Sequence, residues 1–231
     1  MKKIIVLTGA GISAESGIST FRDSNGLWEQ HRIEDVATFD AWRRNPDLVL
    51  EFYNQRRKQL YEVKPNAGHS ALVKLEKKFD VQIITQNVDD LHEQAGSSQV
   101  LHLHGELKKV RSTVDENLVY TLEGWELKKG DKCEKGSQLR PHIVWFGEAV
   151  PMIATAQKLS AEADIYIVIG TSLNVYPAAG LVYYVKKGTP VYLIDPHAEM
   201  LPDVKNLTVL SETAGKGVPK LVKQLLAQGK G

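Results

Sequence analysis

Cysteine, excess charge and long apolar runs are all scarce in this 231-residue chain. A single cysteine, Cys133, excludes an internal disulfide and favours a reducing compartment. The 29 basic and 28 acidic residues leave a net charge of +1, so the chain lacks the basic field that is typical of nucleic-acid binders. The apolar run at residues 4–7 is too short for a signal peptide or a membrane span. We therefore expect a cytoplasmic protein with no membrane partner, and the sequence gives no sign of an oligomeric state.

Short apolar segments rich in β-branched residues alternate with helical patterns along the chain. Strands are predicted at residues 3–8, 81–85, 99–103, 142–146, 164–169, 190–194 and 207–210. Helices are predicted at residues 46–62, 67–79, 151–162, 177–187 and 218–228, where Pro46, Pro151, Pro177 and Pro219 stand near helix starts. Nearly continuous hydrophobicity suits strands that are covered on both faces. The alternation predicts an α/β fold with an open parallel sheet and right-handed crossovers.

Two stretches interrupt this alternation. Residues 17–45 are rich in small polar side chains and follow the first strand and turn directly, which is typical of a functional loop. Residues 105–140 are polar, contain Gly124, Gly130 and Gly136, and show no long periodic segment. We expect the second stretch to form a small inserted subdomain.

The segment TGAGISA joins the first strand to a helix. Gly9, Gly11 and Ala14 fit the G-x-G-x-x-G/A pattern, in which small residues and a helix N-terminus accommodate a pyrophosphate. A hydride-transferring dehydrogenase would show a second strand about 20 residues on, ending in an acid that binds ribose. A loop follows here instead. The pattern therefore indicates a dinucleotide and argues against an oxidoreductase.

Five motifs in order, GAGISAESGISTFR, TQNVDDLHEQAG, LHLHGEL, LRPHIVWFGE and GTSLNVYPAAGL, resemble the sirtuin family over almost the whole chain. The resemblance implies a Rossmann-like parallel sheet with helices on both faces and NAD as the co-substrate. It also implies deacylation of acyl-lysine peptides and proteins, which yields nicotinamide, O-acyl-ADP-ribose and free lysine. The implied NAD-binding domain spans residues 1–104 and 141–231, the small subdomain spans 105–140, and a helical insertion at 31–64 forms part of the acyl and cofactor pocket.

Cofactor-facing positions follow from the same resemblance. The matching residues are Gly9, Ala10, Gly11, Ser13, Glu15, Phe21, Arg22, Gln86, Asn87, Asp89, Gly170, Thr171, Ser172, Asp195 and Ala214. Asn87 or Asp89 could equally cap the helix that follows, and both roles are compatible. Asp195 replaces the asparagine common in the family, and its carboxylate should accept ribose hydroxyls and repel a 2′-phosphate, which favours NAD over NADP.

His104 is the predicted catalytic base, with Asn87 as its partner in catalysis. His92 and His102 lie nearby, but the three histidines have no fourth ligand at zinc-finger spacing, so we expect no metal there. An imidazole titrates near neutral pH and can take a proton from a ribose hydroxyl. If residues 99–103 form a strand, His102 shares a side with His104, and the alternative is that one of the two is structural.

Two further groups match substrate positions. Val144, Phe146, Gly147, Glu148, Asn174 and Val175 match segments between which a substrate peptide adds as a strand, with Trp145 as a possible wall. Tyr53 and Arg56 lie three residues apart on one helix face, where a phenol and a guanidinium together can bind a carboxylate. This Y-x-x-R resembles the branch that removes succinyl, malonyl and glutaryl groups, and Ala37 matches the small residue that leaves space for a larger acyl chain. The alternative is a solvated helix face, because Arg56, Arg57 and Lys58 are consecutive.

The four zinc cysteines of typical sirtuins are absent, and one thiolate cannot form a structural zinc site. We therefore predict a subdomain without zinc, held by an apolar cluster of Val119, Leu122, Trp125 and Leu127. Two other functions remain open. One is mono-ADP-ribosyl transfer, and the other is a non-catalytic NAD-binding module.

Overall fold

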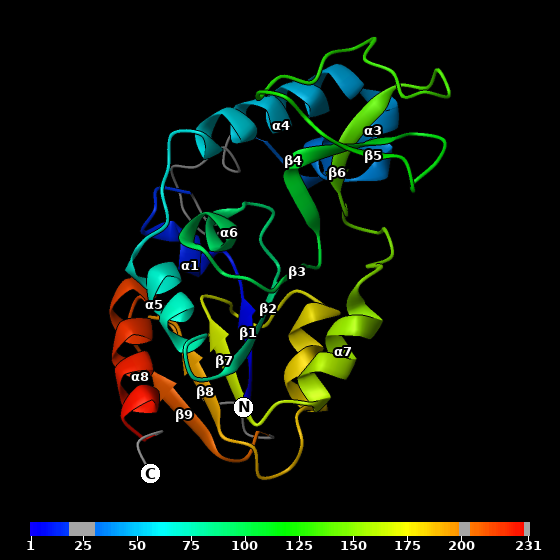
Figure 1. The fold of residues 1–231 in the computed structure, drawn as a ribbon. Coiled ribbons are helices and arrows are strands. Elements are labelled where there is room, and N and C mark those ends of the chain that lie inside the picture. The colour runs from blue at the N-terminus through cyan, green and yellow to red at the C-terminus, as the bar shows by residue number, and fades with distance from the viewer. Residues whose placement is uncertain (19–30, 199–203, 229–231) are drawn as a thin grey trace.

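The computed structural model describes residues 1–18, 31–198 and 204–228 of the chain. Its largest element is a six-stranded parallel sheet with the order β3-β2-β1-β7-β8-β9 (Figure 1). The strands are β1 (Lys3–Thr8), β2 (Asp80–Thr85), β3 (Val100–His102), β7 (Ile165–Ile169), β8 (Val191–Ile194) and β9 (Leu207–Leu210). This sheet confirms the predicted α/β fold, and six of the seven predicted strands lie in it.

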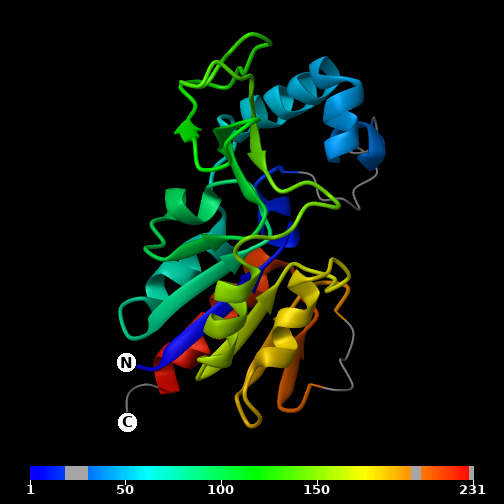
Figure 2. The ribbon, with the colours of Figure 1, turned by 90° about the vertical axis from the view of Figure 1, so that its right-hand side faces the viewer.

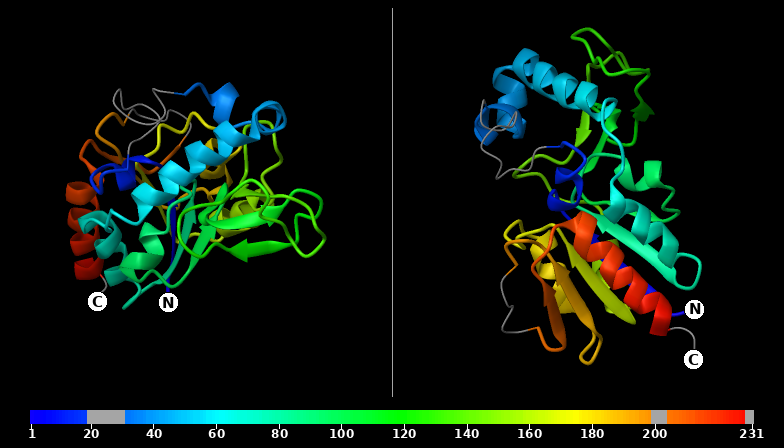
Figure 3. Two further views of the ribbon diagram at one scale, coloured as in Figure 1. Left: turned by 90° about the horizontal axis from the view of Figure 1, so that it is seen from above. Right: turned by 90° about the vertical axis from the view of Figure 1, so that its left-hand side faces the viewer.

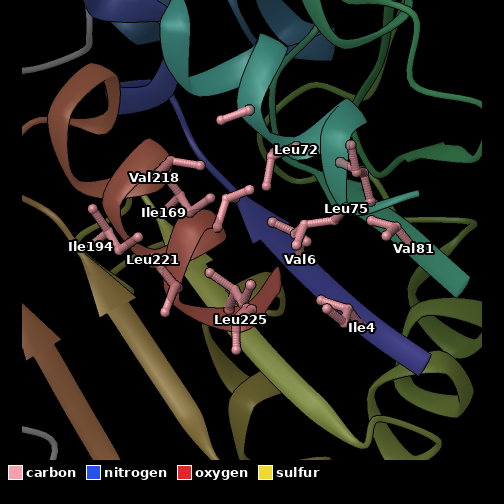
Figure 4. Packing of buried hydrophobic residues seen from close by; sticks show 14 of the residues in the cluster. Ile4, Val6, Leu72, Leu75, Val81, Ile169, Ile194, Val218, Leu221 and Leu225 are labelled. Carbon is pink, nitrogen blue, oxygen red and sulfur yellow. The ribbon is translucent and has the colours of Figure 1, made fainter. Parts of the chain in front are cut away.

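Helices cover both faces of this sheet (Figure 3). Helices α5 (Ala67–Leu75) and α8 (Ala214–Gln228) pack on one face, where Ile4 and Val6 of β1 meet Leu72 and Leu225 (Figure 4). Helix α7 (Ile153–Ala161) and the 3-10 helix η1 (Ala178–Tyr184) pack on the other, which receives the alternate residues of β1. Because both faces are buried, the strands need apolar side chains at nearly every position.

A second, three-stranded antiparallel sheet lies beyond the carboxyl ends of the parallel strands (Figure 2). It has the order β5-β4-β6 and consists of β4 (Gly105–Ser112), β5 (Val119–Thr121) and β6 (Leu139–Ile143). Three helices share a core with it, namely α2 (Ile33–Val36), α3 (Phe39–Arg44) and α4 (Pro46–Leu60). The short helices α1 (Gly11–Ala14) and α6 (Leu91–Ala95) follow β1 and β2.

Residues 105–140, for which a small inserted subdomain is predicted, contain β4, whose inward and outward positions alternate only weakly. Two predictions about elements are wrong. The strand predicted at 142–146 lies at Leu139–Ile143 in the small sheet, because an apolar run does not reveal which sheet it joins. Helix α8 begins at Ala214 rather than 218 and contains Pro219. Its early start is stabilised from outside, since the Glu15 carboxylate accepts the Gly215 N–H at 2.6 Å.

The predicted apolar cluster of the small subdomain is only partly buried, and polar side chains of α4 hold its backbone as well. Val119 and Trp125 are each more than one-third exposed, and only Leu127 of the four predicted residues is fully buried. Asn54 forms two hydrogen bonds with the Leu127 backbone, at 2.9 and 3.0 Å. Arg57 is fully buried and donates to the carbonyls of Leu107 and Trp125 at 2.5 and 2.6 Å. This contradicts the alternative in which the Arg56–Lys58 run is simply a solvated face.

Cys133 lies in the small sheet's connecting loops, where it is 7% exposed. Its thiol donates a hydrogen bond to Ser112 Oγ at 3.2 Å. Across the described residues, no group of three or more histidine, cysteine, aspartate or glutamate side chains has the geometry of a metal site. Within the same ranges, no helix has both the length and the apolar content needed to cross a bilayer.

Candidate active site

The predicted cofactor residues gather at the carboxyl edge of the large sheet. The register pairs Thr8 of β1 with Thr85 of β2 and with Ile169 of β7, and it pairs Ile169 with Ile194 of β8. The residues that follow these positions are Gly9, Gln86, Gly170 and Asp195, so they share one edge. In this strand order the chain reverses direction across the sheet between β1 and β7, which is where open α/β sheets bind ligands.

The glycines of the first turn are required by packing against the loop after β7. A Cβ on Gly9 would lie 2.7 Å from the Thr171 Cβ, and a Cβ on Gly11 would lie 2.6 Å from the Gly170 Cα. The Gly11 N–H also donates to the Gly170 carbonyl at 2.8 Å. The same residues thus bring the α1 N-terminus, with Ala10 as its N-cap, close to the sheet edge. The structure provides a packing reason for the motif beside the predicted approach of a pyrophosphate.

Ser13, Asn87 and Asp89 form a directional hydrogen-bond network. The Asn87 side-chain amide donates to Ser13 Oγ at 3.1 Å, and Ser13 Oγ donates to Asp89 Oδ2 at 3.0 Å. Because its NH₂ group is engaged, Asn87 retains its side-chain carbonyl as an acceptor. Asp89 also accepts the N–H of Leu91, so it caps α6 while belonging to the site. Burial raises the pKa of Asp89, although the hydrogen bonds from Leu91 and Ser13 oppose that shift.

His104 and His102 hold the two carbonyls of the 86–87 segment. The Gln86 carbonyl lies 3.0 Å from His104 Nδ1, and the Asn87 carbonyl lies 3.1 Å from His102 Nδ1. A carbonyl can only accept, so each Nδ1 carries the proton, and neutral His104 has a bare Nε2. Burial lowers the pKa of His104 against the opposing effect of the Gln86 bond, which favours the neutral base.

His102 has a different environment from His104. Its Nε2 lies 2.8 Å from Glu93 Oε1. Burial lowers the pKa of His102, but the Glu93 hydrogen bond and charge outweigh burial and raise the pKa above its usual value. His102 is thus engaged through both ring nitrogens, as expected for a structural residue.

The outer cofactor positions fall into three groups. Asp195 is buried and accepts the N–H of His197 at 2.8 Å, while Gln86 donates to Thr171 Oγ1 at 3.2 Å. Glu15 caps α8, which begins at the buried Ala214, by accepting bonds from Thr213 and Gly215. Ser172 is exposed beside Thr171. The predicted residues Phe21 and Arg22 lie outside the described residues.

Two of the predicted acyl-pocket residues, Tyr53 and Ala37, lie in one buried cluster with residues of the small sheet. Tyr53 is 1% exposed, and its hydroxyl accepts the Trp145 indole N–H at 3.0 Å. That hydroxyl therefore keeps its own proton for a second partner. The Arg56 guanidinium lies 5.9 Å from the centre of the Tyr53 ring, on the same face of α4. Ala37 is buried at the end of α2, and its carbonyl accepts the Phe146 N–H at 3.0 Å.

Glu148 fixes the turn of the 144–148 segment. Its carboxylate accepts the Trp145 N–H at 2.8 Å and both terminal nitrogens of Arg140, at 2.8 and 3.0 Å. Burial raises the pKa of Glu148, but the bonds from Arg140 and Trp145 outweigh burial and lower it overall. Arg140 in turn stacks on the Trp145 ring at 3.5 Å. The Glu148 side chain therefore shapes the segment rather than facing a peptide, and Phe146 and Gly147 stay exposed.

The other predicted substrate segment is exposed as well. Asn174, Val175 and Tyr176 follow β7 and are all exposed, Tyr176 at 70%. Figure 2 shows this loop at the upper edge of the large sheet, below the extended chain that follows β6. Val144, which is half-buried in that chain, donates its N–H to the His104 carbonyl at 2.9 Å. The 144–148 segment is thereby tied directly to His104.

Sequence reasoning missed two kinds of residue in the site. Thr8 and Thr85 are fully buried polar residues at strand ends, and a polar side chain closing an apolar strand was an available signal for them. Arg140 and Arg57 are buried cations whose partners are distant in the sequence, and no local pattern indicates them.

The chain is similar in sequence and structure to known proteins, and these similarities agree with the geometry of the site. Residues 9–177 match the model of the Sir2 family. A protein from Bacteroides thetaiotaomicron named "NAD-dependent protein deacylase" is 57% identical, and the alignment covers 98% of each chain. The structure of a "Sir2 homolog-NAD complex" has a TM-score of 0.90 at 40% identity, covering 99% of this chain and 91% of that one. A structure of "Sir2 bound to acetylated peptide" has a TM-score of 0.79 at 31% identity, covering 98% and 92%.

Proposed function

The chain belongs to the Sir2 family and is an NAD-dependent protein deacylase, and on this premise we propose that it removes both acetyl and acidic acyl groups, succinyl and malonyl, from lysine. The observation that carries the acyl preference is the pair of Tyr53 and Arg56 on one face of α4. The buried Tyr53 hydroxyl keeps a free proton, and the Arg56 guanidinium lies beside its ring. Together they offer a neutral donor and a cation to a carboxylate.

The proposed NAD site uses the carboxyl edge of the large sheet. The fit is supported by Gly9 and Gly11, which pack closely on the loop after β7 and add no side chains of their own to the first turn. Asn87 presents its side-chain carbonyl, and Asp89 presents a carboxylate that the ligand's carboxamide N–H groups could use. Asp195 would accept the adenosine ribose hydroxyls, and its charge would disfavour NADP. The remaining proposed contacts are Ala10, Ser13, Glu15, Phe21, Arg22, Gln86, Gly170, Thr171, Ser172 and Ala214.

NAD supplies an electrophilic ribose carbon and nicotinamide as the leaving group. We propose that His104 Nε2 takes a proton from a ribose hydroxyl, because its Nδ1 proton is committed to the Gln86 carbonyl. Asn87, held by Ser13, orients the same ribose. The proposed products are nicotinamide, O-acyl-ADP-ribose and free lysine.

The acyl-lysine peptide would add as a strand between residues 144–148 and 174–176, a mode that relies on main-chain hydrogen bonds. The exposure of Phe146, Gly147, Asn174 and Val175 supports this binding mode. Val144 lies beside His104 through its main chain, so the peptide would pass close to the base. Ala37 would leave space at the acyl end of the channel.

We propose different roles for the parts of the chain that form the two sheets. Residues 1–104 and 141–231 would bind NAD, residues 105–140 would form the zinc-free subdomain, and residues 31–64 would line the acyl and cofactor pocket. The single cysteine and the balanced charge support a cytoplasmic enzyme that acts on proteins and peptides.

The proposal is tested by mass spectrometry of acetyl-lysine and succinyl-lysine peptides, with and without NAD. We expect loss of both acyl groups only when NAD is present, together with O-acyl-ADP-ribose, and no loss with the His104→Ala variant. Loss of acetyl alone would reject the acidic acyl specificity. ADP-ribose attached to protein, with the acyl peptide unchanged, would favour mono-ADP-ribosyl transfer, and NAD binding without any turnover would favour a non-catalytic module.

A further inference from the structure

Two buried hydroxyls lie directly behind Asn87 and connect β1 to β2. Thr8 Oγ1 donates to Thr85 Oγ1 at 2.8 Å, and Thr85 Oγ1 accepts the backbone N–H of Asn87 at 3.0 Å. Both threonines have no exposed surface. The backbone of Asn87 is therefore held by Thr85 on one side, while its carbonyl is held by His102 on the other.

The bond between the threonines determines the proton position on His92. His92 Nε2 lies 3.1 Å from Thr8 Oγ1. Thr8 has one hydroxyl proton and gives it to Thr85, so toward His92 it can only accept. His92 Nε2 therefore carries a proton, and in the neutral ring Nδ1 is a bare acceptor. That Nδ1 is buried and has no hydrogen-bond partner among the described residues.

His69 of α5 shows the complementary arrangement. Its Nδ1 accepts the Asn66 N–H at 3.3 Å within a capping box, so the proton of the neutral ring lies on Nε2. This Nε2–H is also buried without a partner in the described part of the chain. The His69 and His92 ring centres are 4.9 Å apart, with the planes at 63°. A donor without an acceptor and an acceptor without a donor thus lie on adjacent rings, whereas buried polar atoms are nearly always paired.

We propose that His69 Nε2–H donates a hydrogen bond to His92 Nδ1, and that a small rotation of the rings forms this bond. Both histidines are then positioning residues for Asn87. The completed chain runs in one direction, from Asn66 N–H through His69, His92 and Thr8 to Thr85. Asn66 also donates to the Ile12 carbonyl and to Ser16 Oγ, at 2.7 and 3.0 Å, so the chain begins at the first turn after β1 and ends at Asn87.

The chain needs neutral rings, and burial lowers the pKa of both His69 and His92. The direction in which the hydrogen bonds of the chain run determines how Asn87 is held. If His92 carried its proton on Nδ1 instead, Thr8 would donate to His92 and Thr85 would lose its donor. The hydroxyl that receives the Asn87 N–H would then have no fixed orientation. The inference rests on the proposed role of Asn87 at the nicotinamide ribose.

Two substitutions of His69 separate positioning from folding. His69→Asn places an acceptor near the Nδ1 position, so it keeps the capping box and removes the link to His92. His69→Gln places an N–H near the Nε2 position, so it keeps the link and weakens the cap. We expect His69→Asn to lower kcat for nicotinamide release about tenfold. The KM for NAD should stay within about twofold, and the Tm should stay near the wild-type value. His69→Gln should keep kcat within about threefold despite a lower Tm. If kcat follows Tm in both variants, the proposal is wrong.

The tautomers provide a readout that does not depend on activity. Long-range ¹H–¹⁵N NMR spectra of the full chain should show neutral Nε2–H rings for both His69 and His92. A His92 ring with its proton on Nδ1 would overturn the proposal. Wild-type deacylation measured on the same sample separates the two hypotheses, because an inactive wild type rejects the proposed function while the tautomers still decide whether the chain exists.

Discussion

The Tyr53 hydroxyl is a permanent hydrogen-bond donor in the proposed acyl pocket. Burial raises the pKa of Tyr53 to about 12, so the phenol stays protonated at physiological pH. It accepts from Trp145 and therefore has one proton left for a carboxylate. We expect Tyr53→Phe to raise the KM for succinyl-lysine about tenfold, which corresponds to about 1.4 kcal/mol for one lost charge-assisted bond. Steady-state kinetics with matched succinyl and acetyl peptides measure this change.

The acetyl peptide is the internal control for Tyr53→Phe, because an acetyl group has no carboxylate and its KM should hardly change. Arg56→Met should act in the same direction and more strongly, since it removes the cation. Equal losses on both peptides in either variant would show that the two residues shape the site as a whole instead of binding the acyl carboxylate.

The pKa of His104 determines the pH range in which the proposed base is active. Burial lowers the pKa of His104, so the free base predominates at pH values where an ordinary histidine would be half charged. We expect kcat/KM to rise with pH along an acidic limb whose midpoint lies below about 6.5, the usual value for histidine. A pH–rate profile checks this expectation. A midpoint above that value would mean that another group controls the limb or that His104 acts as a cation.

At the scale of elements, one turn of α4 presents two adjacent pairs of residues with different roles. Tyr53 and Arg56 belong to the proposed acyl pocket, whereas Asn54 and Arg57 hold the loop around Leu127 and the strand β4. Burial lowers the pKa of Arg57 to about 10, so the guanidinium remains charged at neutral pH. Three oxygens, on Leu107, Trp125 and Asn54, accept from it. The small sheet is thus fastened to the same helix that presents the acyl-binding residues.

Arg57→Met should lower the free energy of unfolding by about 2–4 kcal/mol, because it leaves buried oxygens without donors. Amide hydrogen exchange in residues 105–127 should increase more than exchange in the large sheet. Lys58→Met is the matched control, since Lys58 is exposed one position away and its loss should cost less than about 1 kcal/mol. Uniformly faster exchange throughout the chain would argue that Arg57 supports the fold generally rather than the small sheet.

The elements differ in how far the sequence could predict them. The parallel strands were predictable because burial on both faces requires apolar side chains throughout, as in residues 4–7. The small sheet was not, since β6 contains the charged Arg140, which is buried against Glu148 and the Trp145 ring. The start of α8 was not predictable from the local sequence, because the Glu15 carboxylate that caps it belongs to the residue that follows α1.

At the scale of the molecule, motif order along the chain predicted the site edge, since every parallel strand ends at the same side of the sheet. His104, Asn87 and Asp89 lie there as expected. What the sequence could not provide is the second layer of contacts, such as Thr8 to Thr85 and His69 beside His92. These join segments that are more than 20 residues apart, and each residue alone is compatible with many surroundings.

That second layer makes global stability depend on pH. Burial lowers the pKa of His69 to about 4. The titratable group beside His69 is His92, and His102 in turn acts on His92. The unfolded chain, with a histidine pKa of about 6.5, binds this proton more readily than the folded chain between those two values. The free energy of unfolding should therefore fall as pH decreases from about 6.5 toward 4.

For His69 alone, this loss should reach about 2–3 kcal/mol at pH 4.5, from about 1.4 kcal/mol per pKa unit. Urea unfolding at pH 7 and 4.5 measures it, and His69→Asn should lose that much less than wild type over the same interval. His197→Asn, which changes an exposed imidazole, should lose as much as wild type. If His69→Asn also loses as much as wild type, His69 takes up its proton in the folded state, and then the one-directional chain behind Asn87 cannot persist at low pH.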